Sequence, residues 1–352
     1  MNISLWICLF LAFAQAGVLR CAFAAPFTGP NMPRIVPEIA AASDDSSPDS
    51  ASTAQLLGVF PGDVGESQTE SFEKTLGRGV DISEVFAGGS DWQYMDSSNP
   101  DVAGSIAWLM NIWPARRKLE VSIDLLPESQ KSGEYTLKEA AAGAYDDHYR
   151  HAAQLLAARD PNMIIRTGWE MNGNWMAWSA CSDPDAYIGA FRDFVKVLHS
   201  VSRNFRIDWA PNIGKQNCAP DRAYPGDAYV DIVGQDIYEF HKFYSGRTSA
   251  QVWADDHNGP YGVMWWLEFA REHHKPISIP EWGTDVDDGY FMKQMINLIR
   301  TNTVLYQSAW DLHSAPSALE NNPINFALYK AAFGPSSIHP ESVSTPYPKG
   351  NQ

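Results

Sequence analysis

The chain has 352 residues, which is enough for one large barrel or two ordinary domains, and its 13 tryptophans, 14 tyrosines and 16 phenylalanines exceed what a core of this size requires. Its formal net charge of −16 is a poor match for a phosphate backbone or an anionic membrane surface, which argues against a nucleic-acid partner.

The N-terminus has the pattern of a secretory signal. An apolar stretch over residues 3–18 is followed by Ala22-Phe23-Ala24, an A-x-A cleavage pattern, although no Lys or Arg precedes the apolar stretch. We therefore predict a signal peptide over residues 1–24 and a secreted or periplasmic protein without membrane contact after cleavage. An uncleaved membrane anchor is the alternative, since ~20 apolar residues can span a bilayer.

Both ends of the remaining chain are poor in apolar residues. Residues 25–54 are rich in Pro and Ser and include AASDDSSPDSASTA, and residues 335–352 are similar in composition. Such segments cannot bury enough apolar surface to fold alone, so we expect a disordered leader and a flexible tail. One catalytic domain over residues 55–334 lies between them.

Eight short apolar runs alternate with helical segments in this domain. The predicted strands are LLGVF (56–60), ISEVFA (82–87), LEVSIDLL (119–126), MIIRTGW (163–169), FRIDWAP (205–211), DIVGQDIY (231–238), PISIPEW (276–282) and VLYQSAW (304–310). Helical patterns precede the fourth, fifth and seventh strands, at 137–159, 184–202 and 261–274. Near-continuous apolar strands alternating with helices indicate a parallel sheet buried on both faces, and eight units predict a single (β/α)8 TIM barrel.

An open doubly wound sheet is the competing architecture. The phosphate-binding signature that such sheets often carry is incomplete, because GRGVDIS has two glycines and no third. The sequence also contains neither a Walker A loop nor a GxSxG nucleophile motif. These observations favour the barrel.

Polar and aromatic residues are concentrated at the predicted strand ends, where barrels build their active sites. These positions hold Asp63, Asp91, Trp92, Asp124, Glu170, Asn212, Asp236, Tyr238, Glu281, Trp310 and Asp311. Glu170 and Glu281 end the fourth and seventh strands, which face one another across the mouth of an eight-stranded barrel. A pair of carboxyls that converge in this way is what hydrolysis of a glycosidic bond requires.

The tryptophans around the first acid have a chemical reason to be there. An apolar wall disfavours the charged form of a carboxyl and raises its pKa, and Trp169, Trp175 and Trp178 could supply that wall around Glu170. Sugar rings also stack on aromatic faces. We expect the tryptophans at strand ends to bind sugar, namely Trp92, Trp175, Trp178, Trp282 and Trp310, and Trp209, Trp265 and Trp266 to pack in the core.

Four motifs resemble those of glycoside hydrolase family 26, in chain order and over residues 55–334. RTGWEMNGNWMAW is similar to the family's fourth-strand motif and carries Arg166, Glu170, Asn172, Gly173, Trp175 and Trp178. WAPN (209–212), YPGDAYVDIVGQDIY (224–238) and PEWG (280–283) resemble the fifth-, sixth- and seventh-strand motifs.

The resemblance implies a retaining double displacement with no metal and no organic cofactor. Glu281 would be the nucleophile and Glu170 the acid and base, while Tyr238 would orient the nucleophile and Arg166 would support the site. The substrate-binding residues that we infer are Asp63, Trp92, Asp124, Trp169, Asn172, Trp175, Trp178, Asn212, Asp236, His241, Trp282 and Trp310.

One position departs from the family pattern. Mannanases of the family usually have histidine immediately before the acid, and this chain has Trp169. The family's usual substrate is β-1,4-mannan, so the departure makes a β-glucan or a bacterial exopolysaccharide an alternative.

The cysteines and histidines suggest a disulfide and no metal site. Cys181 and Cys218 follow neighbouring strands whose loops would meet on the active face, and a bond between them is favoured over free thiols. Zinc has little support, because the pairs His148/His151 and His273/His274 have no third ligand at a defined spacing.

The sequence thus predicts a secreted, monomeric, retaining endo-β-glycosidase that acts on a β-linked polysaccharide. A catalytically silent barrel that binds polysaccharide is the alternative from another class. An inverting hydrolase is a third possibility, which the separation of the two carboxyls would reveal.

Overall fold

The computed structural model describes residues 55–62, 65–97, 99–129, 133–244 and 246–335. The predicted signal peptide, the leader, Asp63 and nearly all of the tail lie outside these residues. Within these ranges, no helix combines the length and the apolar character that crossing a bilayer requires.

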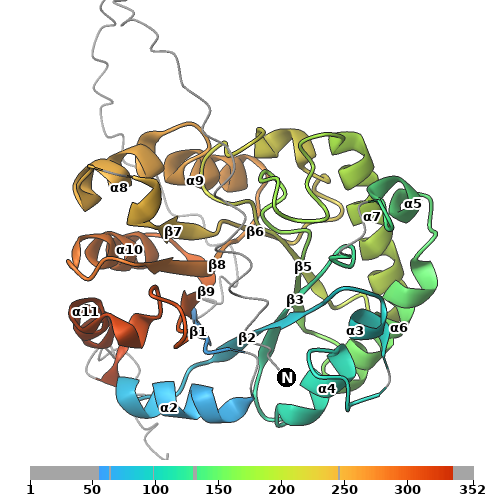
Figure 1. Cartoon of the computed structure of the whole chain (residues 1–352), viewed down its shortest axis with the longest axis horizontal. Helices are drawn as coiled ribbons and strands as arrows, with labels where there is room; N and C mark the ends of the chain where they lie inside the picture. The colour runs from blue at the N-terminus through green and yellow to red at the C-terminus, as the bar shows by residue number, and fades with distance from the viewer. Residues whose placement is uncertain (1–54, 63–64, 98, 130–132, 245, 336–352) are drawn as a thin grey trace, which may run out of the picture. The chain divides into compact units, whose positions relative to one another are not determined.

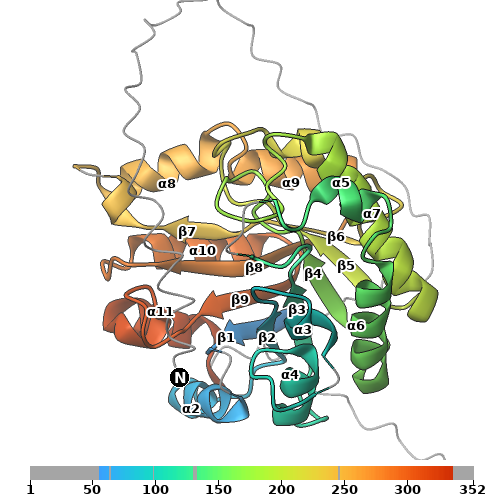
Figure 2. The same ribbon diagram turned by 45° about the vertical axis from the view of Figure 1, so that its right-hand side comes forward.

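Nine parallel strand segments form one closed barrel with the helices outside it (Figures 1 and 2). They are β1 (Leu56–Phe60), β2 (Ile82–Ala87), β3 (Leu119–Ile123), β4 (Ile164–Thr167), β5 (Arg206–Trp209), β6 (Ile232–Gly234), β7 (Ile237–Glu239), β8 (Ile277–Thr284) and β9 (Val304–Trp310). The sheet order β6-β5-β4-β3-β2-β1-β9-β8-β7 closes because β6 also pairs with β8. The predicted (β/α)8 barrel is confirmed.

The sixth predicted strand is divided into β6 and β7, which both pair with β8. The interruption falls at Gln235 and Asp236. Asp236 forms an isolated bridge with Asn212, and its backbone N–H donates to Pro211 O (3.1 Å). The chain therefore leaves the ladder where the Asp236 side chain enters the barrel.

The principal helices are α2 (Glu66–Leu76), α4 (Ile106–Ile112), α6 (Asp146–Arg159), α7 (Pro184–Val201), α8 (Ser249–Asn258), α9 (Val263–Glu272), α10 (Tyr290–Thr301) and α11 (Pro323–Phe333), with the shorter α3 (Gln93–Asp96) and α5 (Leu137–Ala141). The predicted helix over 137–159 is two helices, because Gly143 between them adopts a φ of 80°. Only a 3-10 turn, η2 (Pro220–Ala223), connects β5 to β6.

The interior of the barrel is apolar at one end and polar above it. A small cluster of Ile82, Ile164, Ile232, Leu305 and Tyr306, with Leu56 against it, lies at or near the strand starts. It comes largely from alternate strands, as the layers of such barrels do. Charged and hydroxyl side chains lie between this apolar cluster and the carboxyl ends of the strands, where they position the residues of the candidate active site.

Candidate active site

Glu170 lies on a tight turn at the end of β4. Its φ of 52° and the φ of 56° at Gly168 are both in the left-handed region, which for a residue other than glycine costs about 1–3 kcal/mol. The Glu170 N–H donates to Ala210 O beyond β5 (2.8 Å), and Gly173 N–H donates back to Glu170 O (2.9 Å). The turn is thus held against the neighbouring strand end, and it directs the carboxyl into the mouth.

The Glu170 carboxyl is 7% exposed and has a donor on each oxygen. Trp175 Nε1–H donates to Oε2 (2.7 Å), and the side-chain amide of Asn212 donates to Oε1. Burial, and then the charge of Glu281, raise the pKa of Glu170 to about 7, while the two hydrogen bonds lower it. A substantial fraction of this carboxyl is therefore protonated at neutral pH.

Glu281 enters the same mouth from β8. Tyr238 Oη donates to its Oε2 (2.9 Å) and Arg166 Nη2 donates to its Oε1 (2.5 Å), so both oxygens receive a hydrogen bond. Burial first, and then the charge of Glu281, raise the pKa of Tyr238 well above its usual value, which keeps the phenol a donor. Each oxygen of the Glu281 carboxyl thus accepts one hydrogen bond, and one of the two donors is the cationic guanidinium of Arg166.

Arg166 is fully buried inside the barrel, below the two glutamates. Its nitrogens donate to Ser122 Oγ (2.7 Å), to both oxygens of Asp236 (2.9 and 3.0 Å), to Glu84 Oε1 (2.8 Å) and to Glu281 Oε1 (2.5 Å). The guanidinium thus joins four strand regions beneath the mouth. Asp236, predicted to bind substrate, is fully buried on this cation and offers no surface to a ligand.

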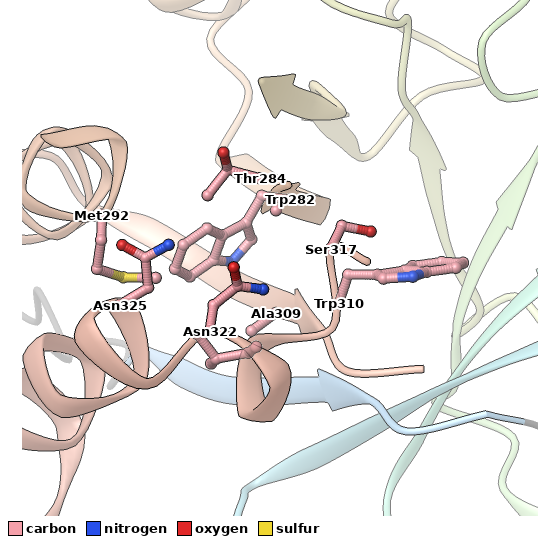
Figure 3. A pocket seen from close by; sticks show the side chains of 10 residues that line it. Trp282, Thr284, Met292, Ala309, Trp310, Ser317, Asn322 and Asn325 are labelled. Carbon is pink, nitrogen blue, oxygen red and sulfur yellow. The ribbon is translucent and has the colours of Figure 1, made fainter. Parts of the chain in front are cut away.

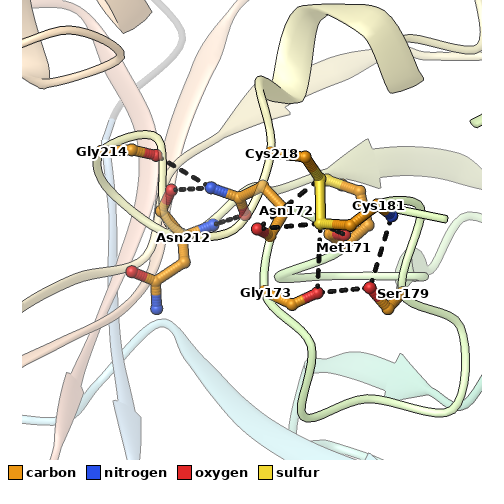
Figure 4. Close-up of a disulfide and its surroundings, with 8 residues drawn as sticks. All are labelled: Met171, Asn172, Gly173, Ser179, Cys181, Asn212, Gly214 and Cys218. Carbon is orange, nitrogen blue, oxygen red and sulfur yellow. Dashed lines mark hydrogen bonds between the residues drawn. A yellow bond between two sulfur atoms is a disulfide. The ribbon is translucent and has the colours of Figure 1, made fainter. Parts of the chain in front are cut away.

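The loop after β4, which carries Glu170, is joined by a disulfide to the loop after β5 (Figure 4). Cys181 and Cys218 are joined, with an S–S distance of 2.08 Å. Asn172 is fully buried between the loops, where its side-chain amide donates to Asn212 O (2.8 Å) and Gly214 O (2.9 Å) and its Oδ1 accepts from Asn212 N–H (3.0 Å). Asn172 was predicted to bind substrate, but its side chain instead holds the backbone of Asn212 in place. Asn212 in turn donates a hydrogen bond to Glu170.

Removal of the disulfide should destabilise the fold. The bond closes a loop with a sequence separation of 37, for which the chain-entropy relation gives ~4 kcal/mol. We expect the double variant Cys181→Ser, Cys218→Ser to have a markedly lower Tm, measured by thermal unfolding. Dithiothreitol should lower the Tm of the wild type toward that of the variant and leave the variant unchanged; an equal effect of the reductant on both would contradict this prediction.

Of the six tryptophans predicted to bind substrate, two keep exposed surface at the mouth and four are buried. Trp175 is 38% exposed, and Trp310 is half-buried and packs on Phe60 with 4.4 Å between ring centroids. Trp282 is 1% exposed, donates to Gln307 Oε1 (2.5 Å) and packs toward the helices on the side away from Trp310 (Figure 3). Trp282 therefore offers no face to a sugar, contrary to the expectation from its place at a strand end.

Three other predicted sugar-binding tryptophans also have little free surface. Trp92 is 9% exposed and stacks on His148 (4.5 Å between centroids), and Trp178 is fully buried with its Nε1–H donated to Trp169 O (2.7 Å). Trp169 is 4% exposed, and its ring lies 5.1 Å from the Arg166 guanidinium carbon. The Trp169 ring therefore packs against the Arg166 guanidinium and has little surface left for a sugar.

The last two predicted binding residues follow β3 and β7 in the chain. Asp124 is 8% exposed, and its Oδ2 accepts from Gly89 N–H (2.9 Å). Burial first, and then Glu128, raise the pKa of Asp124 well above its usual value. His241 begins the short 3-10 helix η3 (His241–Phe243) after β7.

Sequence reasoning missed a set of polar residues inside the barrel. Glu84, Glu120 and Asp208 are fully buried on β2, β3 and β5; Asp208 Oδ2 accepts from Ser278 Oγ (2.5 Å) and Tyr306 Oη (2.7 Å). Each is the only acid in its strand, in ISEVFA, LEVSI and RIDW. An isolated acid inside a strand that is otherwise buried on both faces was the available signal.

Among the described residues, Asp311, His313 and Glu320 bring one candidate ligand atom each to within 4.8 Å of one another. Asp311 Oδ1 accepts the Glu320 backbone N–H (2.8 Å), and His313 Nε2 lies 3.5 Å from Glu320 Oε2. These contacts connect the end of β9 to the 3-10 turn η4 (Leu319–Asn321).

Comparison with known proteins agrees with the geometry. The model of glycosyl hydrolase family 26 matches residues 123–254, a range that includes Arg166, Glu170 and Tyr238 and ends before Glu281. Endoglucanase H of Acetivibrio thermocellus is 25% identical over 298 residues, which are 78% of this chain and 30% of that protein. The chain thus spans about a third of the length of this relative.

Two solved structures share the fold. A modular endo-β-1,4-mannanase of Cellulomonas fimi aligns with a TM-score of 0.59 and 18% identity, over 81% of this chain and 73% of that one. The catalytic domain of a family 26 endo-β-1,4-mannanase from a Bacillus species aligns with a TM-score of 0.58 and 16% identity, over 82% and 89% of the two chains. The resemblance of this chain to glycoside hydrolase family 26, inferred from its motifs, is confirmed.

Proposed function

We propose that this chain is a retaining endo-β-glycosidase that hydrolyses a β-linked polysaccharide. The observation that supports it most directly is the contrast between two carboxyls in one mouth. Glu170 is buried, with a pKa raised to about 7, and Glu281 accepts hydrogen bonds from the Tyr238 phenol and from the cationic Arg166 guanidinium. One protonated and one ionised carboxyl are the two groups that the reaction needs.

In the first step, an oxygen of Glu281 attacks the anomeric carbon while the proton of Glu170 moves to the glycosidic oxygen. The bond between the anomeric carbon and that oxygen breaks, and the leaving sugar departs as an alcohol. Trp175 is partly exposed and donates a hydrogen bond to Glu170. Its ring provides an aromatic face for a sugar next to the cleaved bond.

In the second step, Glu170 is the base. Formation of the glycosyl ester removes the negative charge of Glu281, which is the second largest cause of the raised pKa of Glu170. The pKa of Glu170 therefore falls once the intermediate forms, and its carboxylate can take a proton from water. Water then attacks the anomeric carbon and regenerates the Glu281 carboxylate, with overall retention.

The activity should decline on the alkaline side. Glu170 must be protonated in the first step, and its pKa is raised to about 7. On this side of the profile kcat/KM should therefore have its full value below pH 7 and fall as the pH rises through 7. A pH–rate profile on a soluble polymer measures this limb. In Trp175→Phe, loss of the hydrogen bond that stabilises the carboxylate should move the limb to higher pH; movement to lower pH would contradict the assignment.

The substrate screen should include β-1,4-mannan, β-glucans, xylans and bacterial exopolysaccharides. The family resemblance favours mannan, and the 25% identical relative, Endoglucanase H, is the reason to add β-glucan. Release of reducing ends, analysed by product size and by anomeric configuration at early times, tests endo action and retention together. Polymer binding without any release would support the silent barrel, and inverted products would overturn the double displacement.

We further propose that the protein acts outside the cytoplasm as a monomer, with residues 1–24 removed and residues 55–334 as the catalytic domain. The A-x-A pattern at residues 22–24 and the Cys181–Cys218 disulfide support this, since disulfides persist in oxidising compartments. N-terminal sequencing of the exported protein and light scattering test the two parts separately.

A further inference from the structure

The Arg166 guanidinium is unusual in the number of acids around it. Its five N–H groups are matched by five acceptor contacts, on Ser122, Asp236, Glu84 and Glu281. The rings of Phe86 and Trp169 lie 5.4 and 5.1 Å from its central carbon. Hydrogen bonds thus hold the guanidinium around its edge, and the two aromatic rings pack against it.

The charges of this cluster do not balance if every acid is ionised. The carboxylates of Glu84, Asp236 and Glu281 contact one guanidinium directly, and that of Glu120 lies 4.0 Å from its Nε. Four negative charges would face one positive charge in a region closed to water, where like charges repel strongly. Some of these acids must keep their protons.

Of the three acids in direct contact with Arg166, Glu84 has the weakest support for a charge. It receives one hydrogen bond, from the same Nη2 that donates to Glu281, and its Oε2 is buried without a hydrogen-bond partner. Glu84 is also the direct register partner of the fully buried Glu120 on β3. Like charges directly opposite one another on paired strands are unfavourable.

We propose that Glu84 is a positioning residue that remains a neutral carboxylic acid at neutral pH, accepting a hydrogen bond from Arg166 without neutralising it. The positive charge of the guanidinium is then shared between Glu281 and Asp236 and is not offset by Glu84. The titratable groups around Glu84 are Glu120 on β3, Arg166 on β4, Asp236 after β6, Tyr238 on β7 and Glu281 on β8. Burial is the main cause that raises the pKa of Glu84 well above its usual value, and the neighbouring acids add to it.

Infrared spectroscopy tests the protonation directly and does not depend on activity. At pH 7, Glu84→Gln should lose intensity in the carbonyl-stretch band of protonated carboxyl groups. Glu70→Gln is the matched control and should lose none, because Glu70 is a surface residue with a 59% exposed side chain. No loss of this band in folded Glu84→Gln would overturn the inference.

Should Glu84→Gln not fold, carboxyl carbon-13 spectra of glutamate-labelled wild type decide the question. Glu120→Gln and Glu170→Gln identify the signals of two other acids whose pKa values are raised, to about 8 and about 7. A further glutamate with the protonated shift at pH 7, not removed by these variants or by Glu128→Gln, is the expected result. Its absence would overturn the inference.

Kinetics test the positioning role, and this arm rests on the proposed function. Glu84→Ala removes the acceptor and should lower kcat by roughly 10- to 100-fold with little change in KM, since small misplacements of reacting groups have effects of this size. Glu84→Gln keeps an acceptor without charge and should restore kcat to within about threefold. If Glu84 were ionised, Glu84→Gln would remove a buried negative charge beside Arg166, and kcat would not return to within this range.

The spectroscopic test of protonation and the kinetic test of positioning can fail independently of each other. A chain that hydrolyses no polymer would refute the proposed function and leave the infrared result standing. A chain that hydrolyses polymer but shows an ionised Glu84 would refute only the inference.

Discussion

Glu281→Ala should abolish hydrolysis, with kcat/KM lower by on the order of 10⁴-fold or more, because it removes the carboxyl that we assign to form the glycosyl ester. Binding of the polymer should be largely retained, since Trp175 and Trp310 at the rim are unaffected. Reducing-end release and affinity electrophoresis measure the two quantities on the same variant. The fold should also persist, because the substitution removes one negative charge from an acid-rich cluster around Arg166.

A small anion provides the positive test of this role. With an activated glycosyl donor, azide should occupy the space left by the carboxylate, attack the anomeric carbon and give an inverted glycosyl azide. Tyr238→Phe is the graded control: it removes one hydrogen bond to a charged group, about 1.5–3 kcal/mol, so kcat should fall roughly 10- to 150-fold. Full activity of Glu281→Ala without azide would exclude it as the nucleophile.

The fold could be predicted because its signals are local and repeated. Each predicted strand corresponds to an observed one, since parallel strands buried on both faces require near-continuous apolar runs. The differences arise where a single residue has a second requirement. The sixth strand breaks at Asp236, whose side chain turns to Arg166, and the helix before β4 breaks at Gly143.

The candidate site was predictable in part. Glu170 and Glu281 could be found because each ends a strand, and strand ends converge in a barrel. The direction of each tryptophan side chain could not, because residues at one strand end point alternately into the mouth and toward the helices. Trp282, one residue after Glu281, accordingly packs outside the barrel. The acids beneath Arg166 were visible as isolated charges, but their convergence depends on register across the barrel.

Glu170→Gln should separate the two steps of the reaction. On polysaccharide, kcat/KM should fall by about 10²–10⁴-fold, because the departing sugar is a poor leaving group without a proton. On an aryl glycoside with an acidic phenol, the first step should be much less affected, and hydrolysis of the intermediate becomes limiting. Mass spectrometry should then detect a glycosyl-enzyme, with the sugar on the peptide that contains Glu281.

The configuration of the product formed with azide distinguishes the roles of the two glutamates. In Glu170→Gln, azide needs no base, attacks the glycosyl-enzyme and should give a glycosyl azide of retained configuration, opposite to the product of Glu281→Ala. The reverse pairing of configurations would exchange the roles of the two glutamates. Asn212→Ala is the matched control: it keeps the acid and removes one hydrogen bond that lowers the pKa of Glu170, so its alkaline limb should move to higher pH while azide has no effect. Rescue of Asn212→Ala by azide would mean that the loss in Glu170→Gln reflects a disturbed loop and not a missing base.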